Sequence, residues 1–184
     1  MTDSIQMSVK SAVAVITLNR PARHNAMDDA MSAAFGEAIT AAQDDPAVRA
    51  ILLQGSGKSF CTGRDTAALG VRAPGVSDFA HVSRSQKRKF QLLDSQKPLI
   101  AAIRGYAIGG GCELALQCDI RVASRTAQFS LPEIDHGIIT DGGGSGITAA
   151  IAGPSRAKYL LMTGERSDAE QALAWGMVDF VVSD

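Results

Sequence analysis

The sequence predicts an α/β domain in which buried strands alternate with helices, and three observations support this prediction. Apolar runs of strand length occupy Val13–Leu18, Val48–Gln54 and Leu99–Ile103. Helical patterns follow the first and third runs, an alternation typical of α/β folds. With 184 residues and 46% hydrophobic content, the chain can bury a sizeable core. We therefore expect a single domain over residues 1–184.

The first third of the chain contains two of these strands and the helix between them. The first strand ends at Asn19-Arg20-Pro21, a turn sequence. A helix is predicted over Asp28–Gln43, because apolar residues recur there with helical spacing. The expected buried face consists of Met31, Phe35, Ala38, Ile39 and Ala42. The second strand then leads into a glycine-punctuated loop, Gly55–Asp65, whose amides could face a ligand.

The middle of the chain is organised around the stretch Arg104–Leu116. The strand Leu99–Ile103 leads through glycines into a helix that contains Glu113. The first amides of a helix have no partner within it and can bind an anion or a developing oxyanion. Close packing is the plainer use of such glycines, and their spacing matches no phosphate-binding loop. Before this strand, Ser77 is predicted to cap a helix that runs to about Leu93.

The last third continues the alternation of strands and helices. Two short strands are expected, and Pro132 closes the second. A second glycine-rich turn spans Thr140–Ser145. The sequence Ser167-Asp168-Ala169-Glu170 matches a capping box that opens a helix to Trp175. The remaining predicted elements are strands at Ile120–Ala123, Ala127–Ser130 and Val178–Val182, and a helix at Ala157–Met162.

Composition argues against several classes of protein. The net charge of −1 gives no global field to attract nucleic acid. The only dense basic cluster (Arg84, Lys87, Arg88, Lys89) suits a solvated helix face or contact with a substrate phosphate. The cysteines and histidines lack zinc-site spacing, so we expect no metal, reduced thiols and a cytoplasmic setting. Neither a signal sequence nor an apolar run of membrane-spanning length is present.

Three carboxylates are the candidate reactive groups. Glu113, Glu133 and Asp141 each follow a glycine-rich segment or a strand end, where functional groups gather in α/β folds. Spacing alone leaves open whether the three converge.

Several motifs follow one another along the chain: Arg20–Ala26, Gly57–Asp65, Gly105–Ala115, Cys118–Ile120, Phe129–Glu133, Gly143-Gly144, Thr163-Gly164 and Ala172–Val178. Together they resemble the motifs of the enoyl-CoA hydratase/isomerase (crotonase) superfamily. The resemblance implies a spiral of ββα units that binds an acyl-CoA thioester, with no cofactor beyond the coenzyme A of the substrate. Relatives continue beyond the last strand with helices that build a trimer, so the sequence ends before that segment. A homotrimer or dimer of trimers is expected where the segment is present.

The same resemblance assigns roles to individual residues. The backbone amides of Arg64 and Gly110 would form an oxyanion hole for the thioester oxygen. Glu113 and Glu133 fall on the two hydratase carboxylates, which implies addition of water to a 2-enoyl-CoA or the reverse dehydration. Expected substrate-binding residues are Ala26, Thr62, Asp65, Thr66, Gly109, Pro132 and Thr140.

Asp141 leaves alternatives open. An aspartate at this position also resembles dienoyl-CoA isomerases and 4-chlorobenzoyl-CoA dehalogenases, in which it is catalytic. Carnitinyl-CoA dehydratase-like proteins combine it with two glutamates. As a residue before glycine, Asp141 also suits a plain turn. A non-catalytic acyl-CoA-binding protein is a third alternative, against which the retained carboxylates argue.

Overall fold

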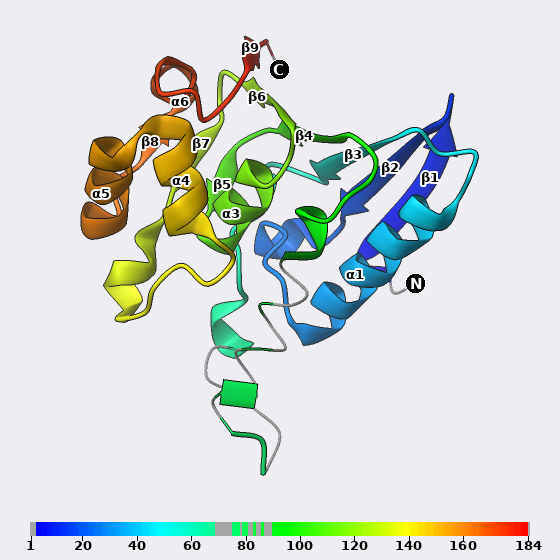
Figure 1. Cartoon of the computed structure of the whole chain (residues 1–184), viewed down its shortest axis with the longest axis horizontal. Helices are drawn as coiled ribbons and strands as arrows, with labels where there is room; N and C mark the ends of the chain where they lie inside the picture. The colour runs from blue at the N-terminus through cyan, green and yellow to red at the C-terminus, as the bar shows by residue number, and fades with distance from the viewer. Residues whose placement is uncertain are drawn as a thin grey trace.

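Two β-sheets form the framework of the protein (Figure 1). The computed structural model describes residues 3–68, 75–77, 79–80, 83, 86 and 90–183. The larger sheet has the order β1-β2-β3-β4-β6-β9, in which β1 is antiparallel to β2 and the other pairs are parallel. Its strands are β1 (Ile5–Lys10), β2 (Val13–Leu18), β3 (Ala50–Gly55), β4 (Leu99–Ile103), β6 (Ile120–Ser124) and β9 (Phe180–Val182). The smaller sheet pairs β5 (Tyr106–Ile108) with β7 (Gln128–Ser130) and β7 with β8 (Ser167–Asp168).

Helices cover the sheets and connect their strands. Helix α1 (Asp29–Asp44) packs on β1 and β2 and buries the face predicted from the sequence. Helix α3 (Gly110–Leu116) contacts α4 (Gly144–Ala152), which packs against α5 (Pro154–Thr163). The others are α6 (Ala169–Ala174) and the short 3₁₀ helices η1 (Pro21–Arg23), η2 (Thr66–Ala68), η3 (Phe90–Leu92) and η4 (Pro132–His136). No helix among the described residues is long and apolar enough to cross a bilayer.

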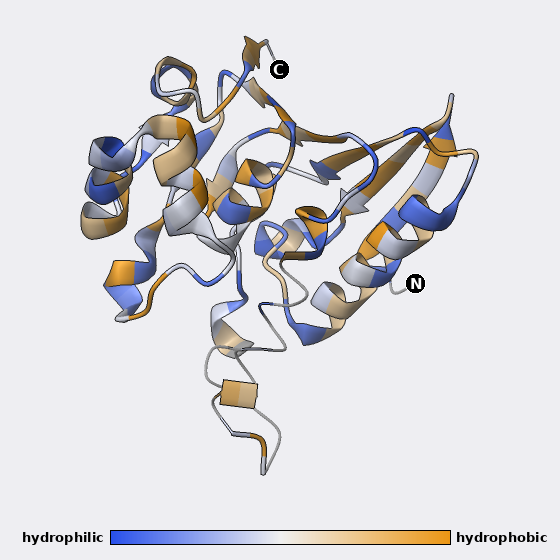
Figure 2. Cartoon of the chain, viewed as in Figure 1, coloured by the Kyte–Doolittle hydropathy of each residue, from blue (hydrophilic) through white to orange (hydrophobic). Residues whose placement is uncertain are grey.

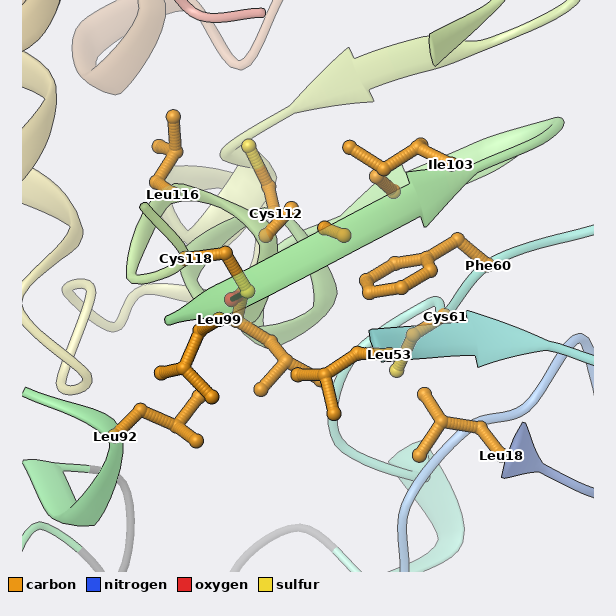
Figure 3. Close-up of a cluster of buried hydrophobic side chains, with 14 of the residues drawn as sticks. Leu18, Leu53, Phe60, Cys61, Leu92, Leu99, Ile103, Cys112, Leu116 and Cys118 are labelled. Carbon is orange, nitrogen blue, oxygen red and sulfur yellow. Dashed lines mark hydrogen bonds between the residues drawn. The ribbon is translucent and has the colours of Figure 1, made fainter. Parts of the chain in front are cut away.

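The core lies where β2, β3, β4 and α3 meet. Figure 3 shows Leu53, Phe60 and Leu99 gathered around β4, with three cysteine side chains among them. Figure 2 shows hydrophobic residues along the strands of the larger sheet and both hydrophobic and polar residues on α1. Burial raises the pKa of the Cys61 and Cys118 thiols to about 12. These thiols therefore serve as small apolar packing groups at neutral pH.

The predicted strands at Val13–Leu18 and Leu99–Ile103 are confirmed residue for residue. The direct passage from Leu99–Ile103 through glycine into a helix is wrong, because β5 intervenes and carries the chain into the smaller sheet. Strand β1 and helix α4 were not predicted. Packing against α3 and α5 forms α4 despite its glycine-rich start.

Two predicted helix starts have different outcomes. The helix after Ser167 is capped one residue later, because the Asp168 side chain accepts a 2.8 Å bond from the Gln171 amide. Ser167 instead is buried in β8. The Ser77 hydroxyl accepts a 3.2 Å bond from the Ala80 amide, as a cap would. Much of the predicted helix beyond it, including the basic cluster of residues 84 and 87–89, lies outside the described residues.

Candidate active site

A tight backbone contact joins the loop before Arg64 to the turn that starts α3. Cys61 forms a parallel bridge with Ala107, through bonds of 3.0 Å to the flanking residues Tyr106 and Ile108. A Cβ on Gly111 would lie 2.1 Å from the Cys61 carbonyl oxygen, so only glycine fits there. Gly109 has a φ of +53°, which L side chains rarely adopt. The two segments therefore meet main chain against main chain.

The Arg64 amide is aimed by a second parallel bridge. The Met27 amide donates to the Gly63 carbonyl at 2.8 Å, and the Asp65 amide donates to the Met27 carbonyl at 2.9 Å. In such a bridge the peptide groups of the central residue point to the opposite side, so the Arg64 N–H is directed away from Met27. A Cβ on Gly110 would lie 3.8 Å from the Arg64 nitrogen. The predicted oxyanion-hole residues are thus neighbours.

The Arg64 side chain has a separate partner. Its guanidinium pairs with Asp29 at 2.7 Å, at the start of α1. This pair holds the loop against α1. The backbone of Arg64, and not its side chain, lies next to Gly110.

Glu113 lies at the centre of the site, on α3, with 2% of its surface exposed. Its Oε1 accepts bonds of 2.8 Å from the amides of both Gly142 and Gly144. Two N–H donors stabilise the charged carboxylate over the neutral acid. A Cβ on Gly110 would lie 4.0 Å from its Oε2. The second carboxylate oxygen therefore adjoins the same turn as the Arg64 amide.

Glu133 approaches this turn from the side of η4. A Cβ on Gly109 would lie 3.1 Å from Glu133 Oε1. The pKa of the Cys112 thiol, next to Glu113 in the chain, is affected by both carboxylates. Burial raises the pKa of its thiol far above the ordinary value, and the charges of Glu133 and Glu113 raise it further. The two glutamates predicted from the sequence therefore converge on Gly109-Gly110.

Thr140 and Asp141 precede the glycines that bind Glu113. Thr140 is 8% exposed, and its Oγ1 accepts a 3.1 Å bond from the Ser145 amide. Asp141 is half-buried and immediately precedes Gly142. Its position in the chain places it beside the glutamate site, and its catalytic role stays a prediction.

The expected substrate-binding residues divide between two places. Ala26, Thr62, Asp65 and Thr66 lie along the loops that flank Arg64, where the Thr62 amide donates to the His24 carbonyl at 3.1 Å. Pro132 begins η4 beside Glu133. These residues lie near Arg64 and Glu133, and their role in substrate binding stays a prediction.

Arg20 and Asn25 fix the loops at the Arg64 end of the site. The side-chain amide of Asn25 donates hydrogen bonds to the backbone carbonyls of Ser59 at 2.8 Å and Phe60 at 3.1 Å. Asp65 pairs with Arg20 at 3.1 Å. The pKa of the Asp65 carboxyl is lowered, mainly by the hydrogen bond from the Ala67 amide and in addition by the Arg20 guanidinium. Together these two effects outweigh burial, which raises the pKa.

Sequence reasoning missed Gln117. Its Nε2 donates to the Gly142 carbonyl at 2.7 Å, on the turn that binds Glu113. The signal was its spacing, since it lies four residues after Glu113, at the C-cap of α3, on the side of the helix where Glu113 lies.

A sequence model of the enoyl-CoA hydratase/isomerase family matches residues 8–184. The chain belongs to this family. It is therefore an enzyme with the α/β crotonase fold, and the predicted fold class is confirmed. The enoyl-CoA hydratase of Thermoplasma volcanium has a similar structure, with a TM-score of 0.91 and 33% identity, covering 100% of this chain and 73% of that one.

Curated relatives in the enoyl-CoA hydratase/isomerase family are similar along almost the whole chain. The crotonyl-CoA hydratase of Syntrophomonas wolfei is 37% identical over 183 residues, which cover 98% of this chain and 69% of the relative. The carnitinyl-CoA dehydratase of Salmonella enteritidis is 39% identical over 184 residues, covering 100% and 69%. The chain thus spans about 69% of the length of these relatives.

Proposed function

We propose that this enzyme adds water to the double bond of a 2-enoyl-CoA thioester, or removes it in the reverse direction. The observation that carries the proposal is the convergence at Gly110. A Cβ there would lie 3.8 Å from the Arg64 nitrogen and 4.0 Å from Glu113 Oε2. Backbone donors and a fixed carboxylate thus adjoin one spot, with Glu133 at the neighbouring Gly109. The relatives named crotonyl-CoA hydratase and carnitinyl-CoA dehydratase support the same reaction class.

The oxyanion hole is the first part of the mechanism. The thioester oxygen accepts hydrogen bonds from the amides of Arg64 and Gly110. When water adds to the β-carbon, electrons move onto this oxygen and an enolate forms. Donors aimed at the developing charge stabilise it more than they stabilise the neutral substrate, and one such donor is worth about 3–4 kcal/mol. The main-chain contacts that fix both segments supply this preorganisation.

The two glutamates divide the proton transfers. Glu113 is held as a carboxylate by two amides, so it accepts a proton from the attacking water through Oε2. Glu133 begins protonated, delivers its proton to the α-carbon and collapses the enolate. The proton that Glu113 took from water then passes to Glu133, which restores both groups. The net reaction consumes one water and gives a 3-hydroxyacyl-CoA. Dehydration uses the same groups in the opposite order.

The first experiment follows crotonyl-CoA with purified protein. Hydration removes the absorbance of the conjugated thioester and adds the mass of one water. We expect Glu113→Gln and Glu133→Gln each to lower turnover by about 10²–10⁴-fold while binding of the CoA ester persists. Glu37→Gln, on the exposed face of α1, is the matched control and should retain wild-type turnover.

Normal turnover in both glutamate variants would refute this mechanism. Absence of hydration by the wild-type protein, tested with crotonyl-CoA and a longer 2-enoyl-CoA, would refute the proposed reaction. A dienoyl-CoA and a halobenzoyl-CoA would then be the next substrates, because they test the alternatives that depend on Asp141.

A further inference from the structure

Glu113 in α3 and Gln117 at the C-cap of that helix bind the same glycine turn. Glu113 Oε1 accepts from the amides of Gly142 and Gly144, and Gln117 Nε2 donates to the carbonyl of Gly142 at 2.7 Å. Gln117 is 7% exposed, so this bond is shielded from water. Side chains four residues apart on a helix lie one above the other, which lets the pair clamp one short segment.

The turn needs such a clamp because of its composition. Gly142, Gly143 and Gly144 are consecutive, and glycine loses more conformational freedom on ordering than any other residue. Gly143 has a φ of +89°, which reverses the chain between the two amides that face Glu113. The carbonyl of Gly142 lies between those amides along the backbone. Fixing that carbonyl therefore restricts the directions of both donors.

The chemistry of the Gln117 amide is set by its partner. A carbonyl oxygen accepts a hydrogen bond, so the NH₂ group of Gln117 must face Gly142. Its Oε1 has no hydrogen-bond partner among the described residues. The side chain thus makes one directed bond within the described structure, and that bond is to the turn.

We propose that Gln117 is a positioning residue, which holds the 142–144 turn so that its two amides keep the Glu113 carboxyl oriented. The tether itself depends only on the geometry above. Its consequence for turnover rests on the proposed hydration reaction, in which Glu113 takes the proton from water. Gln117 itself touches no reacting group.

Amide exchange tests the tether without any substrate. In Gln117→Met, which keeps the side-chain length and removes the donor, exchange at the Gly142 and Gly144 amides should accelerate at least about tenfold. Gln54→Met is the matched control, because it removes one glutamine bond, to Thr17 Oγ1 at 3.0 Å, within the larger sheet. That variant should leave exchange at the turn unchanged. If Gln117→Met does not fold, Gln117→Asn replaces it, since it is one carbon too short to reach Gly142.

Kinetics test the consequence for Glu113. With crotonyl-CoA as the substrate, the kcat of Gln117→Met should fall about tenfold while its KM stays unchanged. In the pH profile of kcat/KM, the acid limb should move to higher pH by about one pH unit. A residue that only stabilises the fold would leave that limb in place, as Gln54→Met should.

Each result has a separate meaning. Unchanged exchange at the turn would overturn the tether, and faster exchange with an unmoved acid limb would overturn its role in positioning Glu113. If the wild-type protein hydrates no enoyl-CoA, the proposed function fails, while the exchange result still decides whether Gln117 holds the turn.

Discussion

Two glycine-rich turns flank Glu113, and they are held in different ways. The Gly109–Gly111 turn is fixed by main chain against main chain, since a Cβ on Gly111 would lie 2.1 Å from the Cys61 carbonyl oxygen. The Gly142–Gly144 turn is fixed by side chains, through bonds from both its amides to Glu113 and from Gln117 to its carbonyl. The first turn is therefore sensitive to a side chain added at Gly111, which would meet backbone, and the second depends on the polar side chains that hold it.

This difference suits the proposed chemistry. Oxyanion donors need an invariant position, which close backbone packing provides without any side chain. The carboxylate needs fixed donors on one oxygen, which the amides of Gly142 and Gly144 provide while Gln117 holds the turn.

The largest expected effect is on the first turn. Gly111→Ala forces a Cβ against the Cys61 carbonyl, and we expect it to lower the free energy of unfolding by about 3 kcal/mol. Gly146→Ala in α4 is the control, because nothing lies within 4 Å of the added Cβ. It should raise stability by about 0.5 kcal/mol through helix propensity. Denaturant unfolding measures both, and equal stability of the two variants would contradict the main-chain account.

A smaller effect is expected at the second turn. Asp141→Asn keeps the size and turn preference of the residue and removes its charge. If Asp141 mainly shapes the turn, turnover of crotonyl-CoA should fall less than about tenfold, against about 10²–10⁴-fold for a residue that transfers protons. Asp135→Asn, exposed on η4, controls for the change in charge. A loss of about 10³-fold or more in Asp141→Asn alone would make Asp141 part of the proton transfer.

The smallest effect concerns the thiol behind the first turn. Burial raises the pKa of Cys61 to about 12. In the unfolded chain the thiol ionises near its ordinary pKa, so the unfolded state loses a proton first as pH rises. Stability is therefore full below about pH 8 and falls above it, by about 0.7 kcal/mol per thiol between pH 8 and 9.

Cys61→Ser isolates this contribution. The hydroxyl can still donate to the Asn25 carbonyl and accept from the Gly63 amide, as the thiol does at 3.2 and 3.3 Å. Its unfolding free energy should decrease less steeply from pH 8 to 9 than that of the wild-type protein. Identical slopes would show that Cys61 is not a buried neutral thiol.

The sequence by itself determined the elements whose residues carry their own pattern. Val13–Leu18 and Leu99–Ile103 are apolar runs of strand length, and both are strands with those bounds. The buried face of α1 follows from helical periodicity, whereas Asp28, predicted as the first helical residue, is instead the cap of that helix. The motifs around Glu113 and Glu133 also identified the family, because each keeps its residue types and order along the chain.

Only the tertiary structure decided how these pieces meet. Strand β5 is three residues long and exists because it pairs with β7 in a second sheet. Helix α4 begins in glycines and is formed by its packing on α3 and α5. The spacing of Gln117 from Glu113 does not reveal its partner, because that partner is a carbonyl 25 residues away in the chain. Local patterns encode local structure, whereas contacts distant in sequence become visible only when the fold brings their backbones together.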